Sequence, residues 1–266
     1  MSDSQDLRSK YRPRKFRHLV QGLSDPTIRA ITSALTQRVL LQAMLVRGPY
    51  GGGKTTTARL LGQRAACTCQ ERHTFEPCGN CDGCLWVMAH PRRSDGWGYS
   101  EFDAQSVSPR EMIVRIMSEI PYCKYGGEIM SQRVVTLDEF HRLPLRDQEK
   151  FVKVIEDAAL QYNTLFVLCV APDATICPAI SQRCAVRPLR LPSIQECIHH
   201  LRLIARAEGR FLAHEDADLL AASAGAVPRA YLGLLQDAIL FSNDGTTVTR
   251  EGVITACDLL CCHTQP

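Results

Sequence analysis

The stretch Val46-Arg47-Gly48-Pro49-Tyr50-Gly51-Gly52-Gly53-Lys54-Thr55-Thr56 decides how the rest of this chain is interpreted. It matches the pattern G-x-x-x-x-G-K-T of a phosphate-binding loop at every position. The apolar run 40–46 before it predicts a buried parallel strand, and the helical spacing of apolar residues over 55–66 predicts a helix after it. The loop therefore joins a strand to a helix, which is the context that this motif requires.

The residue types of this loop suit the triphosphate of a nucleotide such as ATP. Glycines let successive backbone N–H groups face phosphate oxygens, and the start of a helix adds partial positive charge. We expect Lys54 to reach the β- and γ-phosphates and the Thr55 hydroxyl to hold Mg²⁺. The predicted nucleotide contacts of the loop are Gly48, Gly51, Gly52, Gly53, Lys54, Thr55 and Thr56.

The bulk composition is that of an ordinary globular protein. The chain has 266 residues, 45% of them hydrophobic and 22% charged, which suits one large α/β domain or two smaller ones. Its formal net charge of +3 is too small to indicate a nucleic-acid partner. No apolar run approaches the roughly 20 residues that cross a bilayer, and the polar start predicts no signal peptide. We therefore expect a cytoplasmic protein with no membrane partner, whose 13 cysteines are thiols or metal ligands.

Residues 8–17 form a basic arm that contains Tyr11-Arg12-Pro13 and, after it, Phe16. The arm has no acidic residue and carries these basic ones: Arg8, Lys10, Arg12, Arg14, Lys15 and Arg17. Such a run is typical of a solvated arm. An arm that packs over a bound nucleotide, or one that contacts DNA phosphates, remains open as an alternative.

Four cysteines follow the predicted helix with the spacing Cys69-x8-Cys78-x2-Cys81-x2-Cys84. Four thiolates at such spacing can surround one tetrahedral Zn²⁺. The residues between them are turn formers, as tight Cys-x-x-Cys knuckles need. We expect a structural zinc module over about 67–88 with no open coordination position, and Cys67 remains an alternative to Cys69 as a ligand.

The run Arg133-Val134-Val135-Thr136-Leu137-Asp138-Glu139 is an apolar strand that ends in two carboxylates. In a nucleotide-hydrolysing protein, Asp138 is expected to hold Mg²⁺ and Glu139 to orient the attacking water. A helix is predicted over 148–158 and a further buried strand over 164–170.

A strand is also predicted over 99–104, with a helix that starts at Ser108. Pro109 and Glu111 strengthen this start, because Pro suits the first helical position and Ser-x-x-Glu is a capping box. Such a start usually caps itself, and the alternative is that it binds a DNA phosphate.

Two domains are predicted. Residues 1–191 form an α/β nucleotide-binding domain that ends with a strand at 185–187, and prolines mark the linker that follows. Residues 192–266 form a small helical domain with helices over 194–208, 215–222, 229–241 and 250–260.

Together these segments resemble the gamma/tau subunits of bacterial DNA polymerase III clamp loaders, which are members of the AAA+ family of P-loop NTPases. The resemblance extends over nearly the whole chain and rests on Tyr11-Arg12-Pro13, the phosphate-binding loop, the cysteine insert, Leu137-Asp138-Glu139-Phe140-His141, Arg183-Cys184 and Gly225 to Arg229. It implies an AAA+ fold with a central parallel sheet, an inserted zinc module and a small helical lid domain.

The resemblance also implies roles for single residues. Arg183 is expected to be the arginine finger that reaches the γ-phosphate held by a neighbouring subunit, and Arg229 the sensor-2 arginine. Tyr11, Arg12 and Pro13 are expected to line the adenine side of the site, and residues 106–110 to contact the DNA backbone. The implied activity is ATP hydrolysis in a homo- or hetero-oligomer with other loader subunits, a sliding clamp and primed DNA.

The chain departs from the family pattern in four places. Cys169, Val170 and Ala171 stand where a polar sensor-1 residue is usual, so we expect slow hydrolysis. Gln182 replaces the usual Ser before the finger arginine, and Gln21-Gly22 reverses the usual Gly-Gln. The helical collar domain of family members is expected to be absent, because the sequence stops at Pro266. The alternative functions are a non-hydrolysing scaffold subunit within a loader-like complex and a solitary AAA+ switch.

Overall fold

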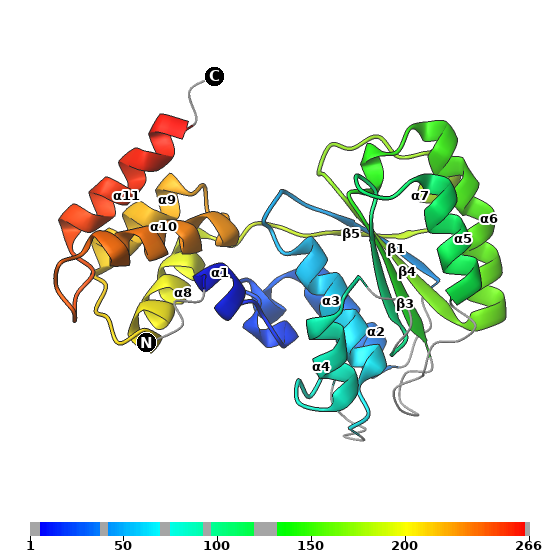
Figure 1. Cartoon of the computed structure of the whole chain (residues 1–266), viewed down its shortest axis with the longest axis horizontal. Helices are drawn as coiled ribbons and strands as arrows, with labels where there is room; N and C mark the ends of the chain where they lie inside the picture. The colour runs from blue at the N-terminus through cyan, green and yellow to red at the C-terminus, as the bar shows by residue number, and fades with distance from the viewer. Residues whose placement is uncertain (1–5, 38–41, 70–74, 93–96, 120–131, 264–266) are drawn as a thin grey trace.

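A computed structural model describes residues 6–37, 42–69, 75–92, 97–119 and 132–263 of the chain. One part of the molecule is built on a parallel five-stranded sheet and the other part is helical, with a single strand-to-helix linker and an N-terminal arm between them (Figure 1). The strand order is β2-β3-β4-β1-β5. The strands are β1 (Ala43–Arg47), β2 (Tyr99–Asp103), β3 (Arg133–Asp138), β4 (Thr164–Val170) and β5 (Ala185–Pro188).

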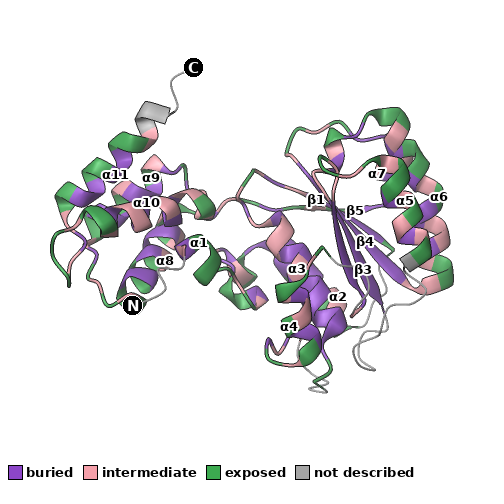
Figure 2. Cartoon of the chain, viewed as in Figure 1, coloured by how far each residue is buried: buried purple, intermediate pink, exposed green. Residues whose placement is uncertain are grey.

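Helices cover both faces of this sheet, as an all-parallel sheet requires. Helices α2 (Pro26–Thr36), α3 (Lys54–Ala66) and α4 (Asp82–Ala89) lie on one side (Figure 1). Helices α5 (Pro109–Glu119), α6 (Leu145–Tyr162) and the short α7 (Pro178–Ser181) lie on the other. Strand β4 is buried along its whole length (Figure 2). Its alternate side chains, such as Val167 and Leu168, enter the cores on the two faces.

The carboxyl ends of β1 and β3 meet at one edge of the sheet because β4 lies between these two strands. Cys169 of β4 pairs with Val46, the second-to-last residue of β1, and Leu168 pairs with Leu137 of β3. The glycine-rich loop and the acidic pair Asp138-Glu139 therefore leave the sheet at the same edge. This register fixes where the site lies.

The helical part has a hydrophobic core of its own, separate from the two clusters on the sheet. The helical part consists of α8 (Ile194–Ala207), α9 (His214–Ser223), α10 (Pro228–Phe241) and α11 (Arg250–His263). Helix α8 begins with a full capping box of Ser193 and Glu196. The separate core supports the division at 191/192, which stays a prediction.

The start of the chain packs on this helical part, which the sequence did not indicate. Leu7 of the short helix α1 (Leu7–Lys10) is buried in the helical core, and its backbone N–H donates to Oε1 of Gln236 on α10 at 2.9 Å. The 3-10 helix η1 (Phe16–His18) instead packs on the sheet domain, where Phe16 is fully buried. Residues 7–19 thus connect the two parts.

The predicted strands and long helices are confirmed, with small shifts at their ends. Residues 38–41, which include the first two positions of the apolar run 40–46, lie outside the described residues. Helices α1, α4 and α7 were not predicted, because each is too short to give a periodic pattern. The α5 start caps itself, since Oγ of Ser108 accepts from the backbone N–H of Glu111 at 3.2 Å. None of the described helices is both long and apolar enough to span a bilayer.

Candidate nucleotide site

The glycine-rich loop between β1 and α3 is shaped to receive an anion. Gly53 has a φ of 102° and immediately precedes α3, so the loop turns directly into the start of that helix. Gly51 has a φ of 72°, and a Cβ atom there would lie 2.6 Å from Cγ1 of Val227. Val227 immediately precedes α10, so the loop is in close contact with the helical part. The positive φ and this contact together require glycine at position 51.

Lys54 is buried within its own loop. Its Nζ donates to the backbone oxygens of Gly48 at 2.8 Å and Pro49 at 3.1 Å, and it lies 5.1 Å from the centroid of the Tyr50 ring. These contacts hold the ammonium beside the loop that would carry the phosphates. Its position suits the predicted role in phosphate binding.

Thr55 and Asp138 meet at the foot of the loop. The Thr55 hydroxyl donates to Oδ2 of Asp138 at 2.8 Å. Burial raises the pKa of Asp138, and the hydrogen bond from Thr55 opposes part of this shift. A hydroxyl and a carboxylate are oxygen ligands of the kind that Mg²⁺ prefers, so these two residues fit the ion predicted here.

Glu139 and His141 complete the same edge of the sheet. Glu139 has a φ of 54°, and its buried Oε2 makes no hydrogen bond within the described part of the chain. Nε2 of His141 lies 3.7 Å from this oxygen and 3.4 Å from the Tyr50 hydroxyl. A left-handed backbone at a residue other than glycine is uncommon and clusters at functional sites, which suits the predicted catalytic role of Glu139.

The end of β4 is apolar, as the sequence indicated. Cys169 is fully buried, and the polar side chain at this place comes from His141, whose Nδ1 accepts from the backbone N–H of Ala171 at 3.4 Å. Burial lowers the pKa of His141, which favours the neutral imidazole that this hydrogen bond needs. Sequence reasoning gave His141 no role, because its neighbour Ala171 is 30 residues away along the chain.

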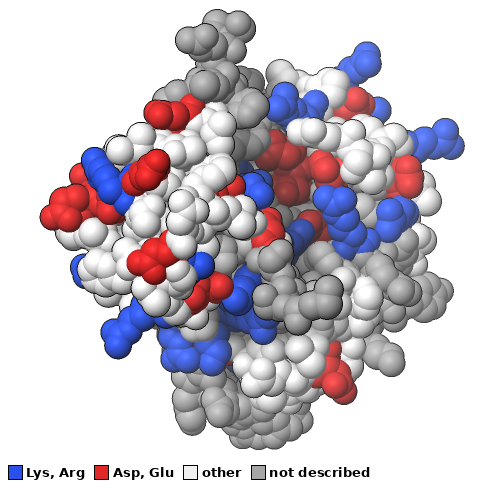
Figure 3. Space-filling model, turned by 60° about the vertical axis from the view of Figure 1, so that its left-hand side comes forward, with Lys and Arg blue, Asp and Glu red and all other residues white. Residues whose placement is uncertain are grey.

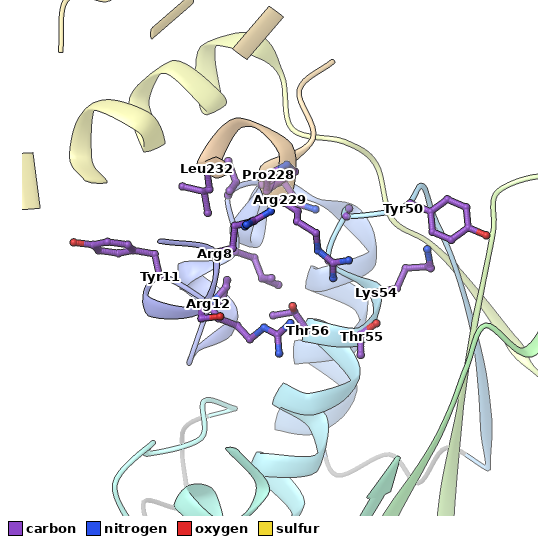
Figure 4. Close-up of a pocket in the computed structure, with 18 of the residues that line it drawn as sticks. Arg8, Tyr11, Arg12, Tyr50, Lys54, Thr55, Thr56, Pro228, Arg229 and Leu232 are labelled. Atoms are coloured by element: carbon purple, nitrogen blue, oxygen red, sulfur yellow. The ribbon is translucent and has the colours of Figure 1, made fainter. Parts of the chain in front are cut away.

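Lys54, Thr55, Asp138 and Glu139 border one cavity of about 560 Å³ between the sheet domain and the helical part. Its walls are the N-terminal arm, the glycine-rich loop, the end of β3 and the start of α10. In Figure 4, Arg229 extends from α10 toward Lys54 and Thr55, and Arg12 of the arm lies near Thr56. Figure 3 shows that the molecule is hollowed on this side and that acidic and basic side chains both lie in the hollow.

Tyr11 borders the cavity, but its ring points away from the loop (Figure 4). Its hydroxyl donates to Oε1 of Glu208, the residue that follows α8. Burial, with the Glu208 carboxylate, raises the pKa of Tyr11 to about 12. Tyr11 thus anchors the arm to the helical part, and its contact with adenine stays a prediction together with those of Arg12 and Pro13.

Arg183 does not border this cavity. It is exposed just after α7, where its Nε pairs with Oε1 of Glu156 at 2.5 Å and its NH1 donates to the Ala179 backbone oxygen at 2.8 Å. The side chain therefore does not serve the site of its own chain. Its place on the surface suits a contact with a neighbouring subunit.

Five cysteines gather where α3 ends and α4 begins. The sulfur atoms of Cys67, Cys69, Cys78 and Cys81 all lie within 4.8 Å of one another, and Sγ of Cys84 lies 3.9 Å from that of Cys78. Backbone N–H groups also face sulfur, as in the 3.3 Å contact from Cys81 to Cys78, which favours thiolates. Four of these five thiols suit one tetrahedral zinc. The group within 4.8 Å contains both Cys67 and Cys69 and leaves out the predicted ligand Cys84, so the choice between Cys67 and Cys69 stays open.

Replacing Cys78 with serine is expected to reduce bound zinc from about one ion per chain to almost none, because a structural site needs all four thiolates. Metal analysis of the purified protein measures this, with Cys257→Ser on α11 as the control. Cys67→Ser and Cys69→Ser then identify the fourth ligand, since only the variant that lacks a true ligand loses zinc. Full zinc occupancy in Cys78→Ser would show that the cluster is not a zinc site.

The fold and the cavity together define a P-loop protein of the AAA+ type. The RuvB Holliday junction branch migration motor of Thermotoga maritima has a similar fold, with a TM-score of 0.64, 14% identity, and coverage of 96% of this chain and 73% of that one. At this identity the likeness concerns the fold alone.

Residues 24–193 match the family described as DNA polymerase III, delta subunit, and the chain belongs to this family. It is 26% identical over 251 residues to the DNA polymerase III subunit tau of Bacillus subtilis, covering 94% of this chain and 42% of that protein. It is 28% identical over 248 residues to the same subunit of Escherichia coli, covering 92% and 36%. The chain thus spans about two fifths of the length of these relatives.

Proposed function

We propose that this chain is an ATP-binding and ATP-hydrolysing subunit of a DNA polymerase III-type sliding-clamp loader that acts in DNA replication. One observation carries the proposal: Lys54, Thr55, Asp138, Glu139 and Arg229 surround a single cavity in a chain of this family. The proposed partners are other loader subunits, a sliding clamp and primed DNA, in the cytoplasm.

The proposed roles follow from where each group lies. The loop N–H groups and Lys54 bind the phosphates, and Thr55 with Asp138 hold Mg²⁺, which neutralises phosphate charge when bound. Glu139 orients the attacking water. Arg229 extends from α10 into the cavity, so that closure of the helical part over the sheet domain depends on the phosphates. Arg183 acts on the site of a neighbouring subunit.

The test is ATP hydrolysis by the chain assembled with partner subunits, measured with and without primed DNA and the sliding clamp. The proposal expects the rate to rise when both are added. A rate that is indifferent to them would contradict a clamp-loading function.

The apolar end of β4 favours a second candidate, a subunit that binds ATP as a scaffold and does not hydrolyse it. The absence of a polar side chain on Cys169, Val170 and Ala171 is expected to slow hydrolysis, since a lost hydrogen bond to the transition state costs about 10²–10³ in rate. Single-turnover phosphate release separates the two candidates. A scaffold binds ATP tightly and releases no phosphate.

Arg229→Ala is expected to weaken MgATP binding about tenfold, because it removes a charge-assisted hydrogen bond to phosphate. A fluorescence titration with an ATP analogue measures this dissociation constant. The control is Arg206→Ala, which removes an exposed arginine of α8 outside the cavity. Equal affinity in the wild type and Arg229→Ala would exclude the proposed contact.

A further inference from the structure

A carboxylate of the cysteine segment holds the N-terminal arm. Glu76 lies two residues before Cys78, and it accepts hydrogen bonds from the backbone N–H groups of Phe16 at 2.6 Å and Arg17 at 3.0 Å. These two N–H groups open the 3-10 helix η1, whose N-cap residue Lys15 provides no side-chain cap. Glu76 supplies that cap from 60 residues away along the chain. The adjacent Phe75 ring lies 6.4 Å from the ring of the fully buried Phe16.

The arm is thereby fixed at both ends. At its start, Leu7 is bonded to Gln236 of α10, and Lys10 pairs with Glu208 at 2.7 Å. At its end, Glu76 and the core beside α3 hold Phe16. Of the residues between these anchors, 11–13 border the nucleotide cavity. In Figure 1 the arm lies between the helical part and the helices α3 and α4.

The arm places Arg12 at the border of the nucleotide cavity. The Arg12 side chain is exposed at the border of the cavity, where partial desolvation and the nearby cations Arg59 and Arg229 lower its pKa, while Glu101 and Tyr99 raise it. The cation Arg229 repels this exposed guanidinium, and the Glu101 carboxylate offsets part of the repulsion. An arm anchored only at the helical part would let Arg12 move away from the cavity, whereas the second anchor keeps Arg12 at its border.

The position of Glu76 depends in turn on the cysteine cluster. The short segment 75–81 turns at Cys78, whose Sγ accepts hydrogen bonds from the backbone N–H groups of Asn80 and Cys81. Helix α4 packs closely against the end of α3: a Cβ atom at Gly83 would lie only 1.9 Å from the backbone oxygen of Ala66. A metal bound by the cysteines would stiffen this segment, since metal binding of small modules is coupled to their folding.

We propose that Glu76 is a positioning residue through which the metal-loaded cysteine cluster holds the arm over the nucleotide cavity. Metal binding and nucleotide binding then favour each other, and thermodynamic linkage makes the effect equal in both directions. The inference rests on the proposed function, because it concerns the affinity of the same nucleotide site.

The experiment compares the wild-type chain with Glu76→Ala and Glu76→Gln. Glu251→Ala, which removes an exposed acid from α11, is the control. We expect Glu76→Ala to weaken MgATP binding about fivefold, because two charge-assisted hydrogen bonds to the arm are lost. Glu76→Gln retains one acceptor oxygen, so its affinity for MgATP is expected to lie between those of the wild type and Glu76→Ala. At saturating ATP, the hydrolysis rate of both variants stays within about twofold of the wild type, since Glu76 lies outside the reacting groups.

A second readout follows the metal and not the nucleotide. In the wild type, bound ATP is expected to slow the transfer of zinc to a chelating dye, and in Glu76→Ala this protection is lost. Both variants are first checked for zinc content and thermal midpoint. If Glu76→Ala loses zinc during purification, the zinc-loaded Glu76→Gln decides by the same two measurements.

An ATP affinity that is unchanged in a zinc-loaded Glu76 variant would overturn the coupling, as would equal protection of zinc by ATP in the variant and the wild type. A wild-type chain that binds no ATP would overturn the proposed function itself. The two failures are therefore distinguishable.

Discussion

Replacing Arg183 with alanine is expected to lower ATP hydrolysis by the assembled complex about 10³-fold, because an arginine finger supplied in trans contributes 10³–10⁵ to the rate. ATP affinity should stay within about twofold, since Arg183 is exposed and borders no part of the cavity of its own chain. Steady-state phosphate release and an ATP titration measure the two quantities on the same preparation.

The control for this substitution is Arg202→Ala, which removes another exposed arginine, on α8. A mixing experiment adds a stricter test where the chain assembles with copies of itself. Complexes of Arg183→Ala and Lys54→Ala chains should recover part of the activity, because some interfaces join an intact loop to an intact finger. Undiminished hydrolysis by Arg183→Ala would show that the finger does not act.

Lys54→Ala is the second large effect. We expect hydrolysis to fall at least about 100-fold, because a buried ammonium beside the phosphates stabilises charge that develops in the transition state. ATP binding should weaken as well, since the proposed contact of Lys54 with the phosphates is also made in the ground state. Single-turnover hydrolysis and a titration with an ATP analogue measure these changes.

The matched control is Lys153→Ala, at an exposed position on α6. Circular dichroism of Lys54→Ala checks the fold, because the substitution also removes the hydrogen bonds to Gly48 and Pro49. A folded Lys54→Ala chain with wild-type turnover would mean that this loop does not bind the reacting nucleotide.

Much of the fold could be predicted because the chain alternates buried strands with amphipathic helices. The loop motif predicted the β1–α3 unit, and the apolar run before Asp138 predicted β3. Parallel strands end at one edge of a sheet, so the sequence also predicted that Lys54, Thr55, Asp138 and Glu139 lie near one another. The contact of the Thr55 hydroxyl with Asp138 is the structural form of that expectation.

Contacts between distant segments that belong to no motif were not predictable. Leu7 is bonded to Gln236, 229 residues away, and Phe16 to Glu76, 60 residues away, and neither pair belongs to a motif. The basic composition of the arm therefore indicated a solvated segment, although Leu7 and Phe16 are buried. The choice among the five cysteines also stayed open, because the sulfur atoms of Cys67, Cys69, Cys78 and Cys81 lie within 4.8 Å of one another and that of Cys84 lies 3.9 Å from that of Cys78.

The same limit applies to the end of β4. The resemblance to the family pattern indicated that a polar group is missing at Cys169, Val170 and Ala171, and β4, which ends at Val170, has no polar side chain at Cys169 or Val170. The imidazole of His141 comes from the turn after β3 to the same place. A pattern within one strand cannot indicate a side chain that is supplied by the turn after a neighbouring strand.

The most direct test of the account is the affinity of the purified chain for MgATP, measured by calorimetry beside Lys54→Ala and Arg229→Ala. The central claim is that the cavity between the glycine-rich loop and α10 binds the triphosphate. The account predicts one site per chain that weakens in both variants and responds to Mg²⁺. A wild-type chain that binds no ATP at millimolar concentration, or binds it equally in all three proteins, would contradict it.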